Sequence, residues 1–575
     1  MKKIISYILS GVMLLSLTAC AATPSPSGIE NNTTPPEVTA SPSPAPVFPT
    51  YPEESADIAD LSEYTIVYPS YYDEYRMGEV FLLKDTIKKV TGAELDIISD
   101  GEEEREHEII FASSGRKNGV EESISMFESG LDYVIGALNG NIILGGNNFY
   151  ADMRAVYDFV NNYLGYNDID NIYSEPESEI SGVNFNIYKE PSIVLMGSNF
   201  AIAPYTEQYA VRDMCEAHIN MTLIEASKYT RQQLADFIKW CARYDIFIIM
   251  RGIQYTDLYT DCPIIWGHVI FDEPLPELET YISVSQSCDN YVEQYSEYGW
   301  KPYVNFAGYD ECFHFLNEYD GLYDAVPIMS YDRYFGQNIA NNTWGSLLRV
   351  YEQGKDIADR KGADVWTYIE SCELVKNKFN TSKLFRWSSY LSLCFGAKGI
   401  LYFQYCDIPY PNNPEYRNGT LINPDYSKNQ AWYDAKECNE ELLKIAEIIN
   451  QYENIGAYVY NSSDKQSDST YIESPYPYFE SIITDIRNND PYALYLFGIF
   501  DKISSNGSHA VILMNLESLD DVPYGGNEPE YTQIKLNGEN IKFYHKGVLQ
   551  NIEPDADGYY SIDVSNGSCW FVTVD

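Results

Sequence analysis

Two adjacent carboxyl groups follow a buried strand in this sequence. The apolar run Val269-Ile270-Phe271 favours a β-strand, and Asp272 and Glu273 come where this strand would emerge into solvent. Pro274 cannot donate a ladder hydrogen bond and favours an extended backbone at Glu273, so we expect the strand to end there. Two adjacent carboxyl groups at the end of a buried strand are energetically unfavourable, so we expect them to have a function. In a parallel α/β barrel, the carboxyl ends of the strands are where catalytic residues lie.

A third acid, Glu370, follows the strand-like run Val365-Trp366-Thr367-Tyr368-Ile369. Two carboxyl groups about 5 Å apart, one protonated and one ionised, can act on a bond between them as acid and nucleophile. The alternative interpretation of Asp272 and Glu273 is a helix start, because acids and proline are favoured in the first turn of a helix.

Strands and amphipathic helices alternate from about residue 192 to residue 452, which predicts a barrel. Eight strand–helix units over about 260 residues match the size of a TIM barrel, a (β/α)8 fold. Asp272 and Glu273 then end the fourth strand, and Glu370 ends the seventh. Amphipathic helices are expected between most of the strands, and the connection between the third and fourth strands is the weakest part of the pattern because no helix is obvious there. The expected strands are 192–196, 221–225, 246–250, 268–271, 302–306, 326–329, 364–369 and 399–403.

The start of the chain has the pattern of an exported protein. Met1-Lys2-Lys3 is positively charged and residues 4–17 are apolar, but this segment is too short for a typical membrane span. It ends in Leu17-Thr18-Ala19-Cys20, which resembles the lipobox of bacterial lipoproteins, and the resemblance implies that Cys20 is lipidated. Residues 1–20 are therefore expected to be a lipoprotein signal peptide. The protein is expected to be anchored by lipid outside the cytoplasmic membrane of a bacterium.

The remaining chain predicts a multidomain α/β protein. Residues 21–55 are rich in Pro, Ser and Thr and form a linker. Residues 56–188 are expected to form a small accessory α/β domain, with a hairpin turn at Asn139-Gly140. Residues 189–455 form the barrel, and strand-like runs in 456–575 predict an antiparallel β-sandwich.

Composition narrows the possible partners. With 38 basic and 85 acidic side chains the net charge is −47, which disfavours nucleic acid and strongly anionic polysaccharides. The 52 tyrosines offer aromatic planes on which sugar rings can pack. None of the six histidines is spaced for a metal site, and no dinucleotide or phosphate-loop motif is present, so we predict no metal and no cofactor. The scattered cysteines after Cys20 are expected to be small buried hydrophobic residues.

Acids on the fourth and seventh strands resemble the arrangement in clan A glycoside hydrolases, which are retaining (β/α)8 enzymes. The resemblance implies that Glu273 is the general acid/base and Glu370 the nucleophile. The chain departs from the clan at two positions. Asp272 stands where the clan has asparagine, and the eighth strand ends in Phe403-Gln404-Tyr405, where the clan often has tryptophan.

Further residues near the expected strand ends could bind an oligo- or polysaccharide. Tyr331 follows the sixth strand, where clan members carry a group that hydrogen-bonds the nucleophile, and Asp332 comes next. The other candidates for substrate binding are Asp272, Trp366, Arg251, Asn305 and Gln404.

Two other functions remain open. β-N-Acetylhexosaminidases end the fourth strand in Asp-Glu, where the aspartate orients the substrate's acetamido group as nucleophile. The hairpin at 132–146 and the helix at 155–159 resemble the domain that precedes the barrel in those enzymes and in α-glucuronidases. On this interpretation Asp272 and Glu273 are the catalytic pair. A barrel that only binds glycans at the cell surface is the other alternative, whereas no serine or cysteine hydrolase motif is present.

Overall fold

The computed structural model describes residues 47–574 apart from 168–171, 200–207, 320, 335–343, 373–381, 407–419, 424, 426, 463–465, 468–478, 490–492, 505–506, 517–530 and 566. The predicted signal peptide with Cys20, and most of the predicted linker, lie outside the described residues. Within the described ranges, no helix is both long enough and apolar enough to cross a lipid bilayer.

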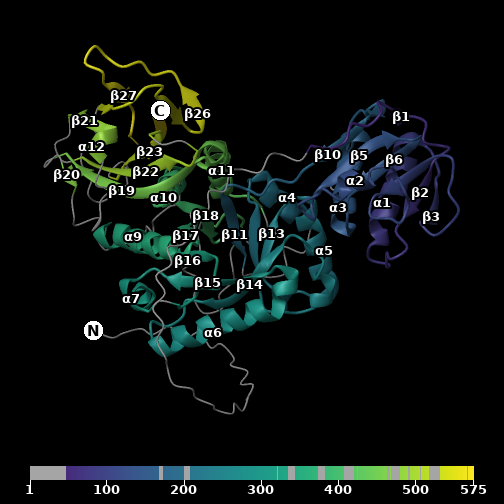
Figure 1. Cartoon of the computed structure of the whole chain (residues 1–575), viewed down its shortest axis with the longest axis horizontal. Helices are drawn as coiled ribbons and strands as arrows, with labels where there is room; N and C mark the ends of the chain where they lie inside the picture. Colours follow the sequence, from purple (N-terminus) through teal and green to yellow (C-terminus); the bar gives the residue numbers. More distant parts are fainter. Residues whose placement is uncertain are drawn as a thin grey trace, which may run out of the picture. The chain divides into compact units, whose positions relative to one another are not determined.

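Eight parallel strands close into a barrel in the order in which they follow one another in the sequence. The prediction of a TIM barrel is thereby confirmed, with β14 as its fourth strand and β17 as its seventh (Figure 1). The strands are β11 (Val194–Asn199), β12 (Met221–Glu225), β13 (Phe247–Arg251), β14 (Ile265–Asp272), β15 (Lys301–Ala307), β16 (Ile328–Asp332), β17 (Asp364–Glu370) and β18 (Ala397–Phe403).

Helices pack outside the barrel between most of these strands (Figure 1). They are α4 (Gln208–Glu216), α5 (Arg231–Arg243), α6 (Leu278–Tyr295), α7 (Asp310–Glu318), α9 (Trp344–Lys361), α10 (Ser382–Cys394) and α11 (Gln430–Ile449). Between β13 and β14 the chain forms only the short 3-10 helix η4 (Thr256–Leu258), as the weak helical pattern there indicated. This connection, all of whose residues the structure describes, therefore contains no full helix.

Apolar side chains fill the barrel interior. Met196, Leu223, Ile249 and Leu401 belong to one buried cluster inside the ring of strands, together with aromatic residues. This filling makes the interior a core rather than a channel, as in other barrels of this size. Any chemistry must therefore take place at an end of the barrel.

The strand β14 is fixed on its outer side by a buried histidine. His268 lies 2.6 Å from the Tyr291 hydroxyl, measured from its Nδ1 atom, and its ring centroid lies 5.1 Å from that of Trp300. Burial lowers the pKa of His268 to about 4, so the ring is neutral at physiological pH. The histidine anchors the strand that ends in Asp272.

The segment before the barrel contains a six-stranded sheet with the order β10-β5-β6-β4-β2-β3. The strands β5 (Tyr133–Leu138) and β6 (Asn141–Gly145) form the predicted hairpin, with positive φ angles at Asn139 and Gly140. The other strands are β2 (Thr65–Tyr68), β3 (Asp96–Ser99), β4 (Glu108–Phe111) and β10 (Val183–Asn186), and the main helices are α1 (Met77–Thr91) and α3 (Phe149–Asp158).

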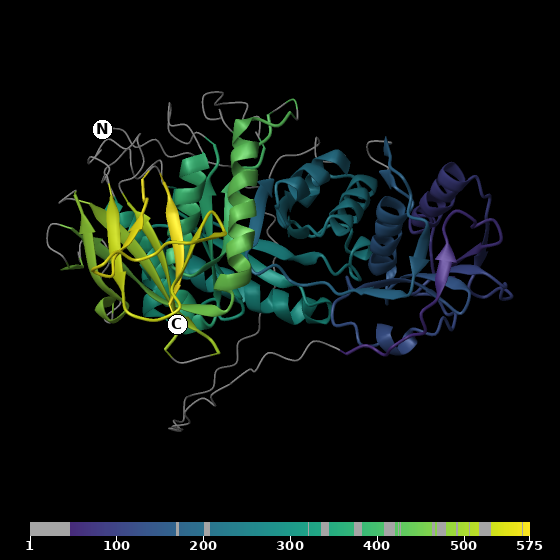
Figure 2. The ribbon, with the colours of Figure 1, turned by 90° about the horizontal axis from the view of Figure 1, so that it is seen from above.

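Two antiparallel sheets follow the barrel, and their strands run side by side in green to yellow (Figure 2). They share one apolar cluster that includes Phe497, Val511 and Ile534. The predicted boundary at residue 455 lies within β19. The larger sheet contains β20 (Gln466–Ser467), β19 (Tyr452–Asn461), β22 (Leu494–Lys502), β23 (His509–Asn515), β28 (Cys569–Val574), β25 (Lys542–His545) and β26 (Val548–Gln550), and the smaller contains β21 (Ile483–Asn488), β24 (Thr532–Leu536) and β27 (Tyr560–Ile562).

The described cysteines carry no disulfide, and nine of the ten are buried. Burial raises the pKa of the Cys438 thiol to about 12, so this side chain remains an uncharged thiol. The prediction that these cysteines act as small buried hydrophobic residues is confirmed for the part of the chain that the structure describes.

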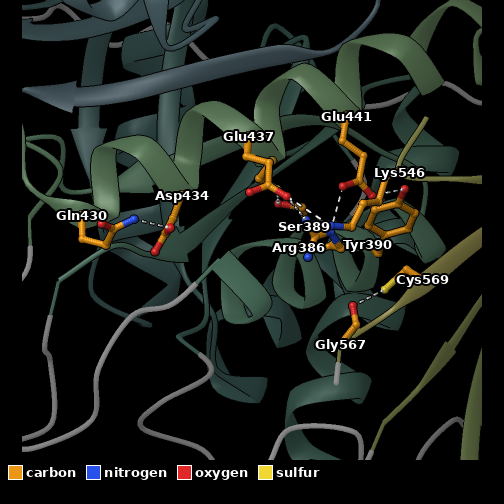
Figure 3. A network of polar contacts seen from close by, with 11 residues as sticks. Arg386, Ser389, Tyr390, Gln430, Asp434, Glu437, Glu441, Lys546, Gly567 and Cys569 are labelled. Atoms are coloured by element: carbon orange, nitrogen blue, oxygen red, sulfur yellow. Dashed lines mark hydrogen bonds and ion pairs between the residues drawn. The ribbon is translucent and has the colours of Figure 1, made fainter. Parts of the chain in front are cut away.

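A buried ion pair joins the last two barrel helices (Figure 3). Arg386 on α10 donates from Nε to Glu441 on α11 at 2.8 Å, and the Tyr390 hydroxyl donates to the other oxygen of Glu441 at 2.9 Å. Arg386 also contacts the more exposed Glu437, which Lys546 from the last sheets reaches at 3.2 Å. Because both Arg386 and Glu441 are buried, each depends on the other for charge neutralisation.

Replacing Glu441 by glutamine should destabilise the protein. The variant leaves the buried guanidinium of Arg386 without its buried counter-charge, and we expect a loss of about 3 kcal/mol in the free energy of unfolding. Urea denaturation followed by tryptophan fluorescence measures this loss as a lower midpoint. Glu440→Gln is the matched control on the same helix, because Glu440 makes only a surface pair with Lys444. Equal midpoints for the two variants would contradict a structural role for the buried pair.

Candidate active site at the carboxyl end of the barrel

The fourth barrel strand ends irregularly. A β-bulge lies between Val269 and Phe271 in the pairing of β14 with β15, so Ile270 is an extra residue on β14. Glu273, which follows the strand, has a φ angle of 51°, a left-handed conformation that is uncommon for a residue with a side chain. Its backbone N–H donates to the Asn305 carbonyl at 2.8 Å, which holds this conformation. Strained residues of this kind cluster at functional sites.

The carboxylate of Asp272 is held by both neighbouring strands. Arg251 at the end of β13 donates from Nη2 to Asp272 Oδ2 at 2.6 Å. Asn305 on β15 donates from Nδ2 to Asp272 Oδ1 at 3.2 Å. The sequence predicted that Arg251 and Asn305 bind substrate. The structure brings both to the barrel mouth, where each already uses a donor to position Asp272.

A chain of hydroxyl groups continues from Asn305 into the barrel. Ser330 on β16 donates to Asn305 Oδ1 at 3.1 Å, and its oxygen lies 2.7 Å from the Tyr303 hydroxyl. Tyr303 in turn donates to Tyr368 at 3.3 Å. All of these side chains are buried, so their hydrogen bonds fix the orientation of Asn305 and, through it, Asp272.

Asp332 is the last residue of the sixth strand, β16, and its carboxyl group lies beside that of Glu273. Burial raises the pKa of Asp332 well above its ordinary value, and the neighbouring carboxyl groups of Glu273 and Asp272 raise it further. The Tyr334 hydroxyl bonds to Asp332 and lowers the pKa in part. Asp332 therefore keeps a proton at a pH where an ordinary aspartate has lost it. This proton can hydrogen-bond to Glu273.

Glu370 is the last residue of β17, where the sequence predicted it. Its register partner on β18 is Phe403, and its side chain is only 3% exposed, whereas Glu273 is exposed. Gln404 follows β18 after a cis peptide bond and is also buried. The Gln404 side-chain oxygen is buried and has no hydrogen-bond partner among the described residues.

The prediction that Tyr331 contacts the substrate needs correction. Side chains alternate along β16, so Ser330 and Asp332 face the barrel mouth and Tyr331 faces the helices. The Tyr331 ring packs edge-on against Phe313 of α7 and Tyr351 of α9. Tyr331 therefore belongs to the contact between strand and helices.

The prediction for Trp366 needs the same correction. Trp366 is buried inside the barrel, 5.4 Å from Trp266 between ring centroids, and belongs to the interior apolar cluster. It also lines a cavity with Lys301 and Lys398, near the amino ends of the strands. Because Glu370 is four residues further along β17, Trp366 lies below the barrel mouth and does not reach it.

Sequence reasoning missed the side chains that support the acids. Ser330, Tyr303 and Tyr368 fix Asn305, and Tyr334 contacts Asp332. Strand alternation could have identified Ser330, since it lies two residues before Asp332 on the same face. The alternation of side chains along this strand is readable from the sequence, but only Tyr331 and Asp332 were predicted as site residues there.

The asparagine variant of Asp332 should alter the pH dependence of stability. Because the folded state raises the pKa of Asp332, it binds a proton that the unfolded chain releases above about pH 4. The stabilising contribution of this proton is complete below that pH and is lost as the pH rises through the folded pKa. Asp332→Asn cannot ionise, so it should gain stability over the parent as the pH rises from 4 to 8, in thermal unfolding scans. Asp289→Asn, an exposed change on α6, is the control, and identical pH profiles for Asp332→Asn and the parent would contradict the shift.

No protein-family model matches this chain, and no curated protein matches it. Among solved structures, a family 39 glycoside hydrolase from Bacteroides cellulosilyticus WH2 is similar, with a TM-score of 0.41 and 11% identity over 70% of this chain and 86% of that one. An endo-β-1,4-mannanase from Thermotoga petrophila has a TM-score of 0.32 and 10% identity over 66% and 92%. A β-galactosidase from the Antarctic haloarchaeon Halorubrum lacusprofundi has a TM-score of 0.32 and 11% identity over 44% and 58%. Likenesses this distant assign no function to the chain.

Proposed function

We propose that this protein is a glycoside hydrolase that cleaves a neutral glycosidic bond with Glu273 as general acid/base and Glu370 as nucleophile. The observation that carries the proposal is that Glu273 and Glu370 stand at the carboxyl ends of two strands, β14 and β17, of one closed parallel barrel. Two carboxyl groups in different protonation states are what retaining hydrolysis of a glycoside requires. The net charge of −47 favours neutral over anionic substrates.

In the first step, the Glu370 carboxylate attacks the anomeric carbon while the bond to the leaving oxygen breaks. Glu273 gives its proton to that oxygen, so the leaving group departs as an alcohol. The carboxyl group of Asp332 lies beside that of Glu273, so Asp332 belongs to the same part of the site. In the second step, Glu273 takes a proton from water, the water oxygen bonds to the anomeric carbon, and Glu370 is released as a carboxylate.

Asp272 supplies a fixed carboxylate next to the acid. Because Arg251 and Asn305 hold one oxygen each, the group cannot rotate, and its remaining lone pairs can accept a sugar hydroxyl or amide. This restraint also supports a second candidate function, cleavage of N-acetylated sugars in which Asp272 orients the acetamido group. A barrel that only binds glycans remains the non-catalytic alternative, and the variants below distinguish it.

The two catalytic carboxyl groups can be tested as a pair. On the neutral oligosaccharide that the parent cleaves best, Glu273→Gln should reduce kcat/KM by roughly 10²–10⁴-fold, because the leaving oxygen is no longer protonated. The loss should be far smaller on the glycosyl fluoride of the same sugar, since fluoride leaves without a proton. Glu370→Ala should be inactive and regain activity with azide, giving a glycosyl azide detectable by NMR.

The exposed carboxyl group of Glu279 on α6 provides the control, and Glu279→Gln should retain parental rates. Full activity in both Glu273→Gln and Glu370→Ala would refute the proposal. An active Glu370→Ala combined with an inactive Asp272→Asn would favour the acetamido mechanism. Binding without hydrolysis by the parent would favour the glycan-binding alternative.

We also propose, from the sequence pattern, that Cys20 carries the lipid that anchors the protein outside the bacterial cytoplasmic membrane. In cells fed radiolabelled palmitate, the parent should take up label and sediment with membranes, and Cys20→Ser should lose the label completely. Cys215→Ser, which changes a partly buried cysteine of α4, should stay labelled. A labelled Cys20→Ser protein would rule out this site of lipidation.

A further inference from the structure

Exposed apolar side chains gather around the candidate acid. They lie on three connections that follow neighbouring strands: after β13, at the end of β14 and after β15. Exposed side chains of this size are individually ordinary, but a group at the mouth of a candidate active site calls for an explanation. This aromatic rim consists of Ile253 (41% exposed), Tyr255 (38%), Phe271 (42%), Leu275 (64%) and Tyr309 (51%).

Tyr309 stands beside Asp332, because the backbone N–H of the preceding Gly308 donates to the Asp332 carbonyl at 2.8 Å. It follows β15, and its backbone N–H donates to the Ala307 carbonyl at 2.8 Å. Partial burial raises the pKa of its hydroxyl, whereas the guanidinium of Arg333 lowers it. The guanidinium of Arg333 lies 5.0 Å from the ring centroid. With half of its surface exposed, the ring keeps an area open to a ligand.

Two features of the fold leave the rim uncovered. The connection from β13 to β14 forms only the short η4, and Ile253 and Tyr255 on it are partly exposed, with the guanidinium of Arg231 on α5 5.9 Å from the Tyr255 ring centroid. The bulge in β14 shifts its register with β15 just before Phe271, whose ring is exposed instead of filling the barrel. Local backbone geometry thus keeps apolar side chains in solvent beside Glu273.

We propose that the aromatic rim is the subsite that binds the leaving group of the substrate. The inference rests on the proposed function. A general acid must stand beside the leaving oxygen, whereas the nucleophile attacks from the opposite face of the sugar. Glu370 belongs to β17, three strands from β14. The surface on the Glu273 side, formed by the connections after β13, β14 and β15, therefore contacts the group that departs.

The charges around the rim define the class of leaving group. Arg251 is paired with Asp272, and Arg231 is paired with Asp257, so these cations are already neutralised. The net charge of −47 disfavours an anionic leaving group. Tyrosine and phenylalanine planes instead pack against the apolar C–H face of a sugar or against an aromatic ring. The rim should therefore accept a neutral sugar or an aromatic alcohol.

The test compares two substrates that differ only in the leaving group: the neutral oligosaccharide that the full-length parent cleaves, and the glycosyl fluoride of its non-reducing sugar. Tyr309→Ala should lose about tenfold in kcat/KM on the oligosaccharide, equal to about 1.4 kcal/mol of lost binding in the transition state. On the fluoride, which offers the rim nothing to bind, the loss should stay within about twofold. Tyr309→Phe should behave like the parent on both, because the ring provides the contact.

The matched control is Tyr433→Ala, which removes an equally exposed tyrosine from α11, and it should leave both rates unchanged. Equal losses of Tyr309→Ala on the two substrates would overturn the inference, because the residue would then act on the reaction centre or on folding. Unchanged rates on both would overturn it too. A parent that hydrolyses neither substrate would instead defeat the proposed function, so the two failures are distinguishable.

Discussion

The hydrogen bonds that Arg251 and Asn305 donate to Asp272 tie three neighbouring barrel strands together at their carboxyl ends. A half-buried carboxylate must find donors, and here both oxygens find them on the strands at either side. The register of β13, β14 and β15 is thereby fixed at the site. The acids that follow depend on this constraint, because Glu273 takes its position from the same strand end.

The site combines a held carboxylate with an exposed one. Asp272 is restrained through a buried chain that reaches Ser330 and Tyr303 inside the barrel. Glu273, one residue later, is exposed and contacts Asp332. Its left-handed backbone turns the chain out of the strand at this point. Catalysis requires that the reacting groups are held close to their productive geometry. The restrained strand end at Asp272 gives Glu273 such a support.

Other buried contacts of the barrel serve stability. Trp266 and Trp366 pack together in the interior, and the buried Arg386–Glu441 pair joins α10 to α11 on the outside. Aromatic residues of the same type thus lie either at the candidate site or in the buried core. Depth along the strand decides the role, because only side chains near the carboxyl end can reach a ligand above the barrel.

The sequence by itself determined the eight strands, the barrel and the positions of Asp272, Glu273 and Glu370 at strand ends, because apolar periodicity and proline act locally. It also indicated the missing helix between β13 and β14. The depth of Trp366 in the barrel, the meeting of Asp332 with Glu273 and the aromatic rim were decided only by the tertiary structure. These features depend on strand register, on one bulge and on contacts between residues up to about sixty positions apart, which are long-range packing effects that no local pattern encodes.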